Sequence, residues 1–369
     1  MSDVLSLKAL NRATLARQML LRREAASALD AVARLAGLQA QVAKPPYLGL
    51  WSRLEGFRRE ELLDLLNRRE VIRATAMRGT LHLLTASDYV ALRPVLQPML
   101  SAGMASTLRA RAATLDVGEL VAAATAFFEE KARTFTELRA HLMERYPDGD
   151  ERAMGFAVRT HLPLAMVPNE STWGFPADSD FTAAAAWLGT AIAENEDPTE
   201  LVRRYLAAFG PATVADAQTW SGLKGLKSTF EAMRSELVTF RDARKRELFD
   251  LPDAPRPSEE TDAPVRFLPE YDNLVLAHAD RSRLIAEEFR PRLVTANLKV
   301  LASFLVDGRV AGTWKVTRKG KSTTLVLEPF EAIAAPIRDA LAEEGLQALR
   351  FSEEDAQTFD LKVDSPLKP

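Results

Sequence analysis

Apolar residues recur at helical spacing through most of the first 250 residues of the chain. Three of the helices that this pattern predicts begin alike, with a hydroxyl residue followed three positions later by an acid, a pair that caps the first turn of a helix. These start signatures are Ser27 to Asp30, Thr134 to Glu137 and Thr213 to Asp216. Each is followed by an amphipathic run, with apolar positions at Val32 and Leu35, at Leu138 and Leu142, and at Val214, Ala217 and Trp220. The repetition indicates three units of one kind.

A pair of short strand-like runs closes each of these units. The paired runs are 71–77 with 80–85, 164–168 with 172–176, and 236–242 with 246–251. Helices followed by a two-stranded hairpin are the layout of a winged helix-turn-helix, so the pattern predicts three such units in tandem.

The hydrophobic pattern changes after residues 252–264, a segment rich in proline and acidic residues that we interpret as a linker. Apolar and β-branched runs then predict strands, with a two-residue hairpin turn at Asp307-Gly308 and a second turn around Gly320. This part is expected to form a small antiparallel β-barrel, followed by a helix near 331–344 and a last strand near 346–351. The fold class that follows is α+β.

Composition excludes several kinds of site. The 369-residue chain has no cysteine, which excludes disulfides and thiolate chemistry, and its four histidines (His82, His141, His161 and His278) lack metal-ligand spacing. We therefore expect neither a metal nor another cofactor. Without a membrane span or a signal peptide, a cytoplasmic protein is expected. The net charge of −3 neither supports nor excludes a nucleic-acid partner, because the acidic and basic residues gather in different segments.

Five stretches of the sequence carry a resemblance to a known family. They are GLQAQVAKPPYLGLWSRL (37–54), MRGTLHLLTASDY (77–89), FGPATVADAQTWSGL (209–223), LPEYDNLVLAHADRSR (268–283) and FLVDGRVAGTW (304–314). In this order, and over nearly the whole chain, they resemble the AlkZ and YcaQ-like DNA glycosylases. Members of that bacterial winged-helix family excise bulky 7-alkylpurines and unhook DNA interstrand crosslinks.

The resemblance implies an organisation and an activity. It implies three winged-helix units at 1–90, 91–180 and 181–251, the linker at 252–264 and a barrel-like domain at 265–369. These parts would surround a concave face for damaged double-stranded DNA, in a monomer that acts in DNA repair without a covalent intermediate. The family motif is Gln-x-Gln in one branch and Gln-x-Asp in the other. Gln39 and Gln41 match the first branch and are, by this resemblance, the catalytic residues.

The chemistry of two amides suits one class of lesion. Alkylation at N7 makes the purine cationic, so that it departs neutral and needs no general acid. An amide offers donor and acceptor atoms that can hold the attacking water, but it is a poor base. The pair therefore favours cationic 7-alkyl or 3-alkyl purines over neutral bases such as uracil. On spacing alone, two glutamines near a helix end are more typical of a solvated surface than of a catalytic pair.

Two groups of polar residues are candidate DNA contacts. Arg78, Thr80 and His82 lie on the first predicted hairpin, where they either face the DNA or serve as a buried histidine and a structural arginine. Lys315, Arg318, Lys319 and Lys321 surround a hairpin tip that either enters a minor groove or is a solvated turn protecting a strand edge.

A second class of function stays open from the sequence. A transcriptional regulator would read base edges through a recognition helix, for which 134–146 offers Arg139, His141 and Arg145. Paired carboxylate catalysis by Asp272 and Asp280 is disfavoured, because Asp272 suits a turn or cap and Asp280 suits an ion pair with Arg281 or Arg283.

Overall fold

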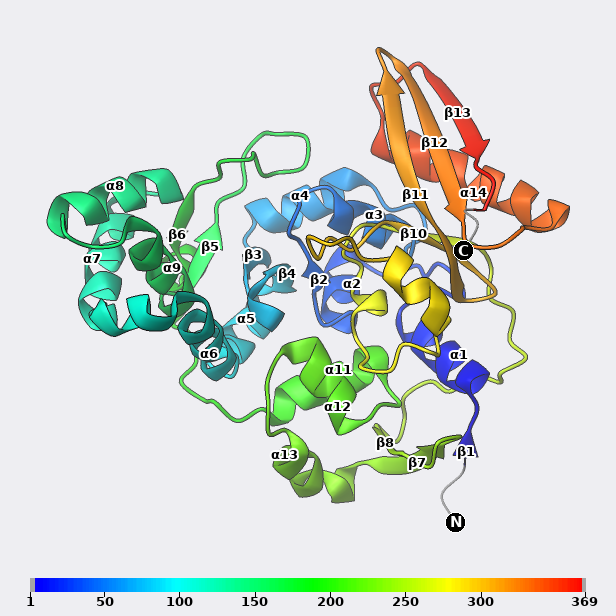
Figure 1. Cartoon of the computed structure of the whole chain (residues 1–369), viewed down its shortest axis with the longest axis horizontal. Coiled ribbons are helices and arrows are strands. Elements are labelled where there is room, and N and C mark those ends of the chain that lie inside the picture. The colour runs from blue at the N-terminus through cyan, green and yellow to red at the C-terminus, as the bar shows by residue number, and fades with distance from the viewer. Residues whose placement is uncertain (1–3, 367–369) are drawn as a thin grey trace.

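Three β-sheets lie between residues 4 and 366, the part of the chain that the computed structural model describes (Figure 1). The first has the order β2-β4-β3-β5-β6 and comprises Leu38–Gln39, Leu81–Thr85, Val71–Thr75, Leu164–Met166 and Phe181–Ala183. The second has the order β1-β7-β8 and comprises Val4–Leu5, Val238–Asp242 and Glu247–Asp250. The third has the order β13-β12-β11-β10-β9 and comprises Thr358–Val363, Ser322–Pro329, Arg309–Lys319, Ser303–Val306 and Arg266–Leu268.

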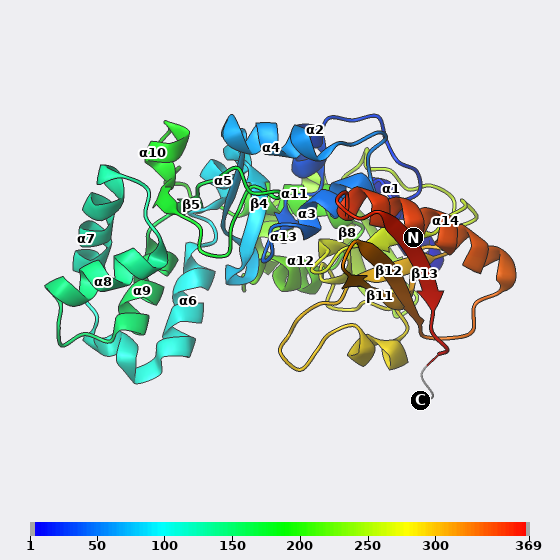
Figure 2. The same cartoon turned by 90° about the horizontal axis from the view of Figure 1, so that it is seen from above.

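The helices form groups around these sheets. Four accompany the first sheet: α2 (Ala28–Arg34), α3 (Pro45–Trp51), α4 (Arg59–Asn67) and α5 (Ala86–Leu92). A second group has a core of its own at one end of the molecule (Figure 2): α6 (Gln97–Leu108), α7 (Val117–Glu130), α8 (Phe135–Arg145) and α9 (Glu151–His161). A third shares a core with the first sheet: α10 (Ala184–Leu188), α11 (Thr199–Phe209), α12 (Val214–Ser221) and α13 (Lys227–Ala232). No helix within residues 4–366 has the length and apolar character that a membrane span requires.

The three predicted helix starts are confirmed. Ser27, Thr134 and Thr213 are the N-caps of α2, α8 and α12, and each hydroxyl accepts a hydrogen bond from the backbone N–H three residues on, at 3.0, 3.2 and 3.1 Å. These bonds satisfy N–H groups that the helix itself leaves without a partner.

Two of the three predicted hairpins are confirmed, and the second differs. β3 pairs with β4 and β7 with β8, but β5 pairs with β6 at 181–183 instead of with residues 172–176. Residues 169–174 form a tight turn, in which the Asn169 N–H donates to the Gly174 carbonyl at 2.7 Å. Trp173 and Phe175 instead pack onto the core around α3 and α4. Since β3 also pairs with β5, the first two hairpins share one sheet, and the count of three winged-helix units stays a prediction.

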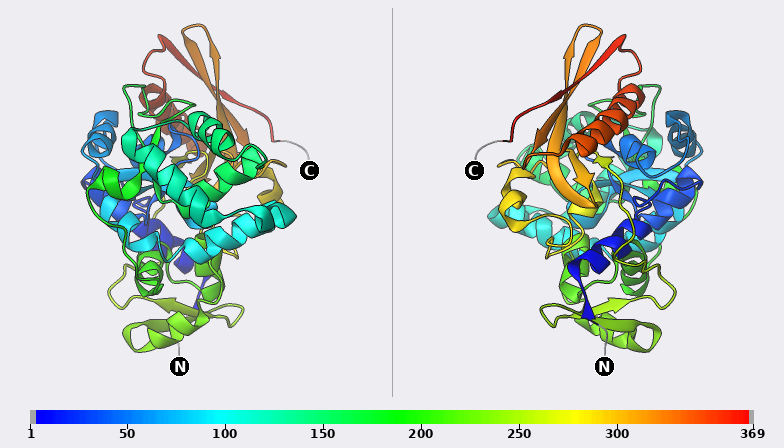
Figure 3. Two further views of the ribbon diagram at one scale, coloured as in Figure 1. Left: turned by 90° about the vertical axis from the view of Figure 1, so that its left-hand side faces the viewer. Right: turned by 90° about the vertical axis from the view of Figure 1, so that its right-hand side faces the viewer.

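The C-terminal sheet is open, so the expected barrel is wrong. β9 and β13 are its two edges, and one face is covered by α14 (Ala335–Ser352), as Figure 3 shows. The strand expected at 346–351 is also wrong, because Leu341, Ala348 and Leu349 are buried at helical spacing within α14. The helix carries the chain back along β12, which explains why the last strand, β13, pairs parallel to it. Both predicted turns are present, and Asp307 and Gly308 have the positive φ values of a tight hairpin.

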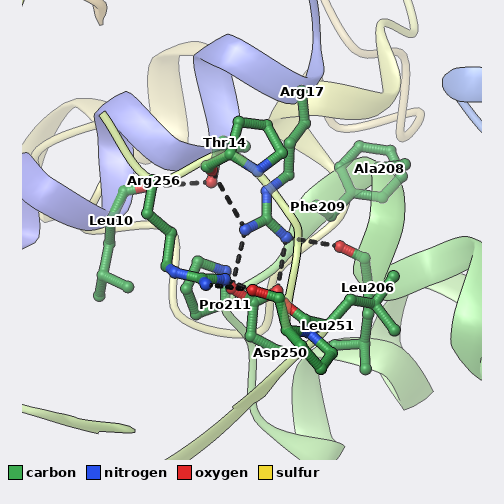
Figure 4. A network of polar contacts seen from close by, with 12 residues as sticks. Leu10, Thr14, Arg17, Leu206, Ala208, Phe209, Pro211, Asp250, Leu251 and Arg256 are labelled. Carbon is green, nitrogen blue, oxygen red and sulfur yellow. Dashed lines mark hydrogen bonds and ion pairs between the residues drawn. The ribbon is translucent and has the colours of Figure 1, made fainter. Parts of the chain in front are cut away.

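A buried ion pair joins the N-terminal helix α1 (Leu7–Arg17) to the second sheet (Figure 4). Arg17 donates from Nη1 and Nη2 to the two carboxylate oxygens of Asp250, at 2.7 and 2.8 Å, and from Nη1 to the Leu206 carbonyl at 2.7 Å. Arg256 donates to the same carboxylate from segment 252–264, which contains neither helix nor strand. This segment is therefore tied to β8 and, through the shared carboxylate of Asp250, to α1. The domain boundaries themselves stay a prediction.

Candidate active site

Gln39 and Gln41 lie where β2 ends and a short loop leads into α3. Gln39 is buried and pairs with His82 across the sheet, whereas Gln41 is exposed at the start of the loop. Pro45 and Pro46 begin α3, where their missing N–H groups cost nothing. Arg73 of β3 fixes the loop backbone, because it donates from Nε to the Ala40 carbonyl at 2.9 Å and from Nη2 to the Gln41 carbonyl at 3.3 Å.

The orientation of both amides is determined by their partners. Oε1 of Gln39 accepts from Nη2 of Arg78 at 2.8 Å, and Oε1 of Gln41 accepts from the backbone N–H of Leu81 at 3.3 Å. Guanidinium and backbone N–H groups can only donate, so the atoms facing them are the amide oxygens. Neither Nε2 donates to a protein group within residues 4–366. The structure therefore holds each amide by its oxygen.

Arg78 connects Gln39 to two distant parts of the chain. It donates to Oδ1 of Asn273 at 3.1 Å and to the carbonyl of Trp220, and Asn273 in turn donates to the Gly37 carbonyl at 3.2 Å. No carboxylate pairs with Arg78 in the described part of the chain. Burial, and secondarily the charge of Arg281, lower its pKa to about 10. The guanidinium still carries its charge at neutral pH, with only neutral acceptors around it.

The backbone at Arg78 has an unusual conformation, and α12 packs closely against it. Arg78 has a φ of +57°, a left-handed conformation that is uncommon for a residue with a side chain. Gly222, just after α12, lies against it, and a Cβ there would approach the Arg78 Cα to 3.2 Å. A glycine is therefore needed for α12 to pack this closely against the turn between β3 and β4.

The three residues of this hairpin that are expected to contact DNA differ in their exposure to solvent. His82 is completely buried, as in the alternative of a buried histidine, and DNA has no access to it in this structure. Its Nδ1 lies 3.1 Å from the Thr80 carbonyl, while its Nε2 has no partner in the described structure. Thr80 is partly exposed, and its hydroxyl donates to the Met77 carbonyl at 3.1 Å. Arg78 is also partly exposed, with three acceptors of the protein around it.

Buried His82 is expected to make the fold less stable as the pH falls. Burial, and then the charge of Arg78, lower its pKa from 6.5 to about 3 in the folded chain. Between these values the unfolded chain binds the additional proton, so the free energy of unfolding decreases as the pH falls from about 6.5 towards 3. Urea unfolding of wild type and His82→Gln between pH 7.5 and 4.5 checks this: the variant should show the shallower decrease. Equal slopes would mean that His82 does not titrate in this way.

The C-terminal hairpin holds the second group of expected DNA contacts. Lys315 pairs with Glu328, and Arg318 donates to both carboxylate oxygens of Asp355, at 2.9 and 2.6 Å. Lys319 and Lys321 are exposed at the tip between β11 and β12 and form no ion pair with any described residue. The two tip lysines are thus free to meet an anion, whereas Lys315 and Arg318 already have protein partners.

The loop that starts at Gln41 forms a ridge between two clefts. One cleft, of about 540 Å³, lies towards α9 and β6 and is lined by Gln41, Arg73, Arg159 and the rings of Phe135, Trp173, Phe175 and Phe181; we call it the aromatic cleft. The other, of about 290 Å³, lies towards the C-terminal sheet and is lined in part by Pro269, Trp314 and Lys315. Val42 and Lys44 line both clefts. Open space therefore lies on both sides of residues 42–44, and Gln41 itself lines the aromatic cleft.

The two aspartates that sequence reasoning set aside are structural. Asp272 accepts two hydrogen bonds from Arg53, both at 2.9 Å, in a fully buried pair. Asp280 pairs with Arg244 and Arg246, and not with Arg281 or Arg283 as expected. In the described part of the chain, no group of three or more His, Asp and Glu residues is arranged to hold a metal ion.

Comparison with known proteins identifies the class to which the chain belongs. The sequence model of the family described as "DNA glycosylase AlkZ-like" matches residues 32–351. The chain is 29% identical over 339 residues to the interstrand DNA cross-link repair glycosylase of Streptomyces sahachiroi, covering 85% of this chain and 88% of that protein. The solved structure of Streptomyces sahachiroi DNA glycosylase AlkZ superposes with a TM-score of 0.79 at 24% identity, over 98% of this chain and 100% of that one.

The chain is thus a DNA glycosylase, a hydrolase that acts on N-glycosyl bonds. It belongs to the AlkZ-like DNA glycosylase family. The family assignment replaces the alternative of a transcriptional regulator, and the overall fold is that of the solved AlkZ structure.

Sequence reasoning missed Arg73, Asn273 and the carbonyl of Trp220, which surround the two glutamines. A signal was present for each. Arg73 is a charged residue inside the otherwise apolar strand VIRAT, while Trp220 and Asn273 fall within stretches 209–223 and 268–283, which carry the family resemblance. With Gln39 and Arg78, four of the five resembling stretches meet at the guanidinium of Arg78.

Proposed function

We propose that this glycosylase removes cationic alkylated purines, chiefly 7-alkylguanines, from double-stranded DNA, with a water held by Gln39 and Gln41. The observation that carries the proposal is the fixed orientation of both amides, each held by its oxygen at the end of β2. Each amide oxygen has a second lone pair that can accept from a water, and each NH₂ group remains a donor.

The proposed reaction needs little from the protein beyond the positioning of the attacking water. The bond between C1′ and the purine nitrogen breaks, and its electron pair neutralises the cationic base, which leaves without protonation. The water oxygen forms the new bond to C1′, and its proton passes to solvent. Amides are too weak as bases to activate water strongly, so their contribution is orientation, which suffices when the leaving group is already activated.

Interstrand crosslinks fall within the proposed substrate range. The relative from Streptomyces sahachiroi is named for the repair of such crosslinks. A crosslinked base stays bonded to the opposite strand and cannot swing out of the duplex as a free base does. The open clefts on both sides of the ridge at Gln41 support access to a base that remains in place.

A base-release assay tests the proposed function. Wild-type protein is incubated with a duplex that carries one 7-methylguanine, and with a duplex crosslinked through N7. The expected products are free 7-methylguanine, an abasic site in an uncleaved strand, and separated strands from the crosslinked duplex. Duplex binding without release of either base would contradict the proposal.

The two tip lysines of the C-terminal hairpin are expected to bind DNA phosphates. Lys319→Ala/Lys321→Ala should lower the affinity for duplex DNA, and the slope of log affinity against log salt should become shallower by about 0.9 for each lost phosphate contact. Arg318→Ala is the comparison variant, because the pairing with Asp355 leaves Arg318 less available, and its effect should be smaller. Unchanged affinity and slope in the double variant would remove the hairpin from the DNA interface.

A further inference from the structure

Two arginines line the aromatic cleft without a carboxylate partner. Arg73 is buried, donates only to backbone carbonyls, and stacks with its guanidinium 4.7 Å from the centre of the Phe175 ring. Arg159 of α9 is half-buried, and its guanidinium lies 5.9 Å from the centre of the Phe135 ring. Within residues 4–366, Arg159 forms no hydrogen bond and no ion pair.

The two charges are unbalanced in the free protein. Burial lowers the pKa of both groups, and the charge of Arg159 lowers the pKa of Arg73 further. Asp178 also lines the cleft, but it is exposed and pairs with neither arginine. Neighbouring cations in a partly apolar cleft are costly unless an anion completes the site. The arrangement therefore indicates a negatively charged ligand.

We propose that Arg159 and Arg73 bind one backbone phosphate of the damaged DNA strand in the aromatic cleft, beside Gln41. Guanidinium groups match phosphate oxygens in geometry, and DNA is the polyanion on which this family acts. The apolar rings of the cleft would face the adjoining sugar. The site deepens the proposed function and rests on it, because the reacting sugar is placed at Gln41.

Arg73 gives the site a second role. The same side chain that faces the cleft also holds the carbonyls of Ala40 and Gln41. A phosphate bound by Arg73 therefore has a fixed position relative to the loop that carries Gln41. Phosphate contacts of this kind fix the position of a protein along DNA. Replacing Arg73 would also release the loop, so Arg159 is the residue to test.

The experiment is a scan of the phosphates around the lesion by binding alone. The probes are duplexes with one 2′-fluoro-7-methylguanine, whose fluorine retards base loss. Each duplex carries a single neutral methylphosphonate, placed in turn at one of the five phosphates on either side of the lesion. Wild type is expected to lose about tenfold in affinity at one position, the size of a charge-assisted contact. Arg159→Gln should be several-fold weaker than wild type on the unmodified duplex, show a shallower salt slope, and lose clearly less than wild type at that position, because only Arg73 still contacts the phosphate there. Arg159→Lys should recover part of the loss.

The control is Arg145→Gln on the neighbouring helix α8, where the guanidinium is exposed and lies 5.8 Å from the Tyr146 ring. This variant should keep the wild-type profile. The same profile in Arg159→Gln as in wild type would overturn the proposed phosphate site. Because base release is not measured, failure of the catalytic proposal for Gln41 would leave this readout unchanged, and the two can be distinguished.

Discussion

Replacing Gln41 with alanine is expected to lower the single-turnover rate of 7-methylguanine release by roughly 10²-fold, the cost of a reacting group that is no longer positioned. Its amide is the exposed member of the pair, and alanine removes it together with one part-buried hydrogen bond, that from the Leu81 N–H. Duplex affinity should change little. The measurement is base release with enzyme in excess, beside binding to the same duplex.

A carboxylate in the same cleft provides the matched control for that variant. Asp178 lines the aromatic cleft with Gln41 and would be the base if the reaction used one. Asp178→Asn should keep close to wild-type activity, because an already cationic base needs no strong base to be displaced. Activity retained in Gln41→Ala but lost in Asp178→Asn would move the catalytic role from the amides to the carboxylate.

Replacing Arg78 with methionine is expected to reduce both base release and stability. The side chain holds Gln39, Asn273 and the Trp220 carbonyl together, and methionine cannot donate to any of them. Each buried acceptor left without a partner costs about 1–3 kcal/mol of unfolding free energy. A displaced Gln39 amide would slow the reaction by up to roughly 10²-fold. Thermal unfolding and single-turnover rates measure the two effects.

Arg69 offers a matched control for the Arg78 variant. It also has a positive φ, of +63°, but its exposed side chain donates to one carbonyl, that of Trp187, at 2.9 Å. Arg69→Met should therefore leave base release unchanged and lower the melting temperature only slightly. Equal loss of activity in the two variants would show that Arg78 acts through general stability and not through Gln39.

Local features of the fold could be predicted from the sequence. Ser27, Thr134 and Thr213 begin helices because their hydroxyls accept a hydrogen bond within the next turn, and Asp307-Gly308 forms a hairpin because the turn needs two positive φ values. These signals depend on residues no more than three positions apart. They are therefore readable without knowledge of the rest of the molecule.

Long-range packing decided the features that were predicted wrongly. Residues 346–351 are apolar enough for a strand, but Leu341, Ala348 and Leu349 form one helical face that packs on the C-terminal sheet. Residues 172–176 also resemble a strand, but Trp173 and Phe175 instead fill the core around α3 and α4. In both cases the sequence indicates correctly that the segment is apolar. It does not indicate which surface of the protein the apolar side chains pack against.

The candidate site also combines features that the sequence indicates with contacts that only the fold creates. Gln39 and Gln41 came from the family resemblance, because two glutamines at this spacing are ordinary surface residues. The carbonyl of Trp220 and Asn273 lie 142 and 195 residues from Arg78 along the chain, and only the fold brings them together. The resemblance marked their stretches as belonging to the family. It did not indicate that they converge on one guanidinium.

Two held amides suffice for the proposed reaction because the leaving base is already cationic. A comparison of two purines that differ in charge tests this directly. Wild-type protein is given matched duplexes with one 7-methylguanine or one hypoxanthine, and base release is followed under single-turnover conditions at pH 7. We expect rapid release of 7-methylguanine and no release of hypoxanthine above the uncatalysed rate. Release of neutral hypoxanthine at a comparable rate would contradict it, because that reaction needs an acid that Gln39 and Gln41 cannot supply.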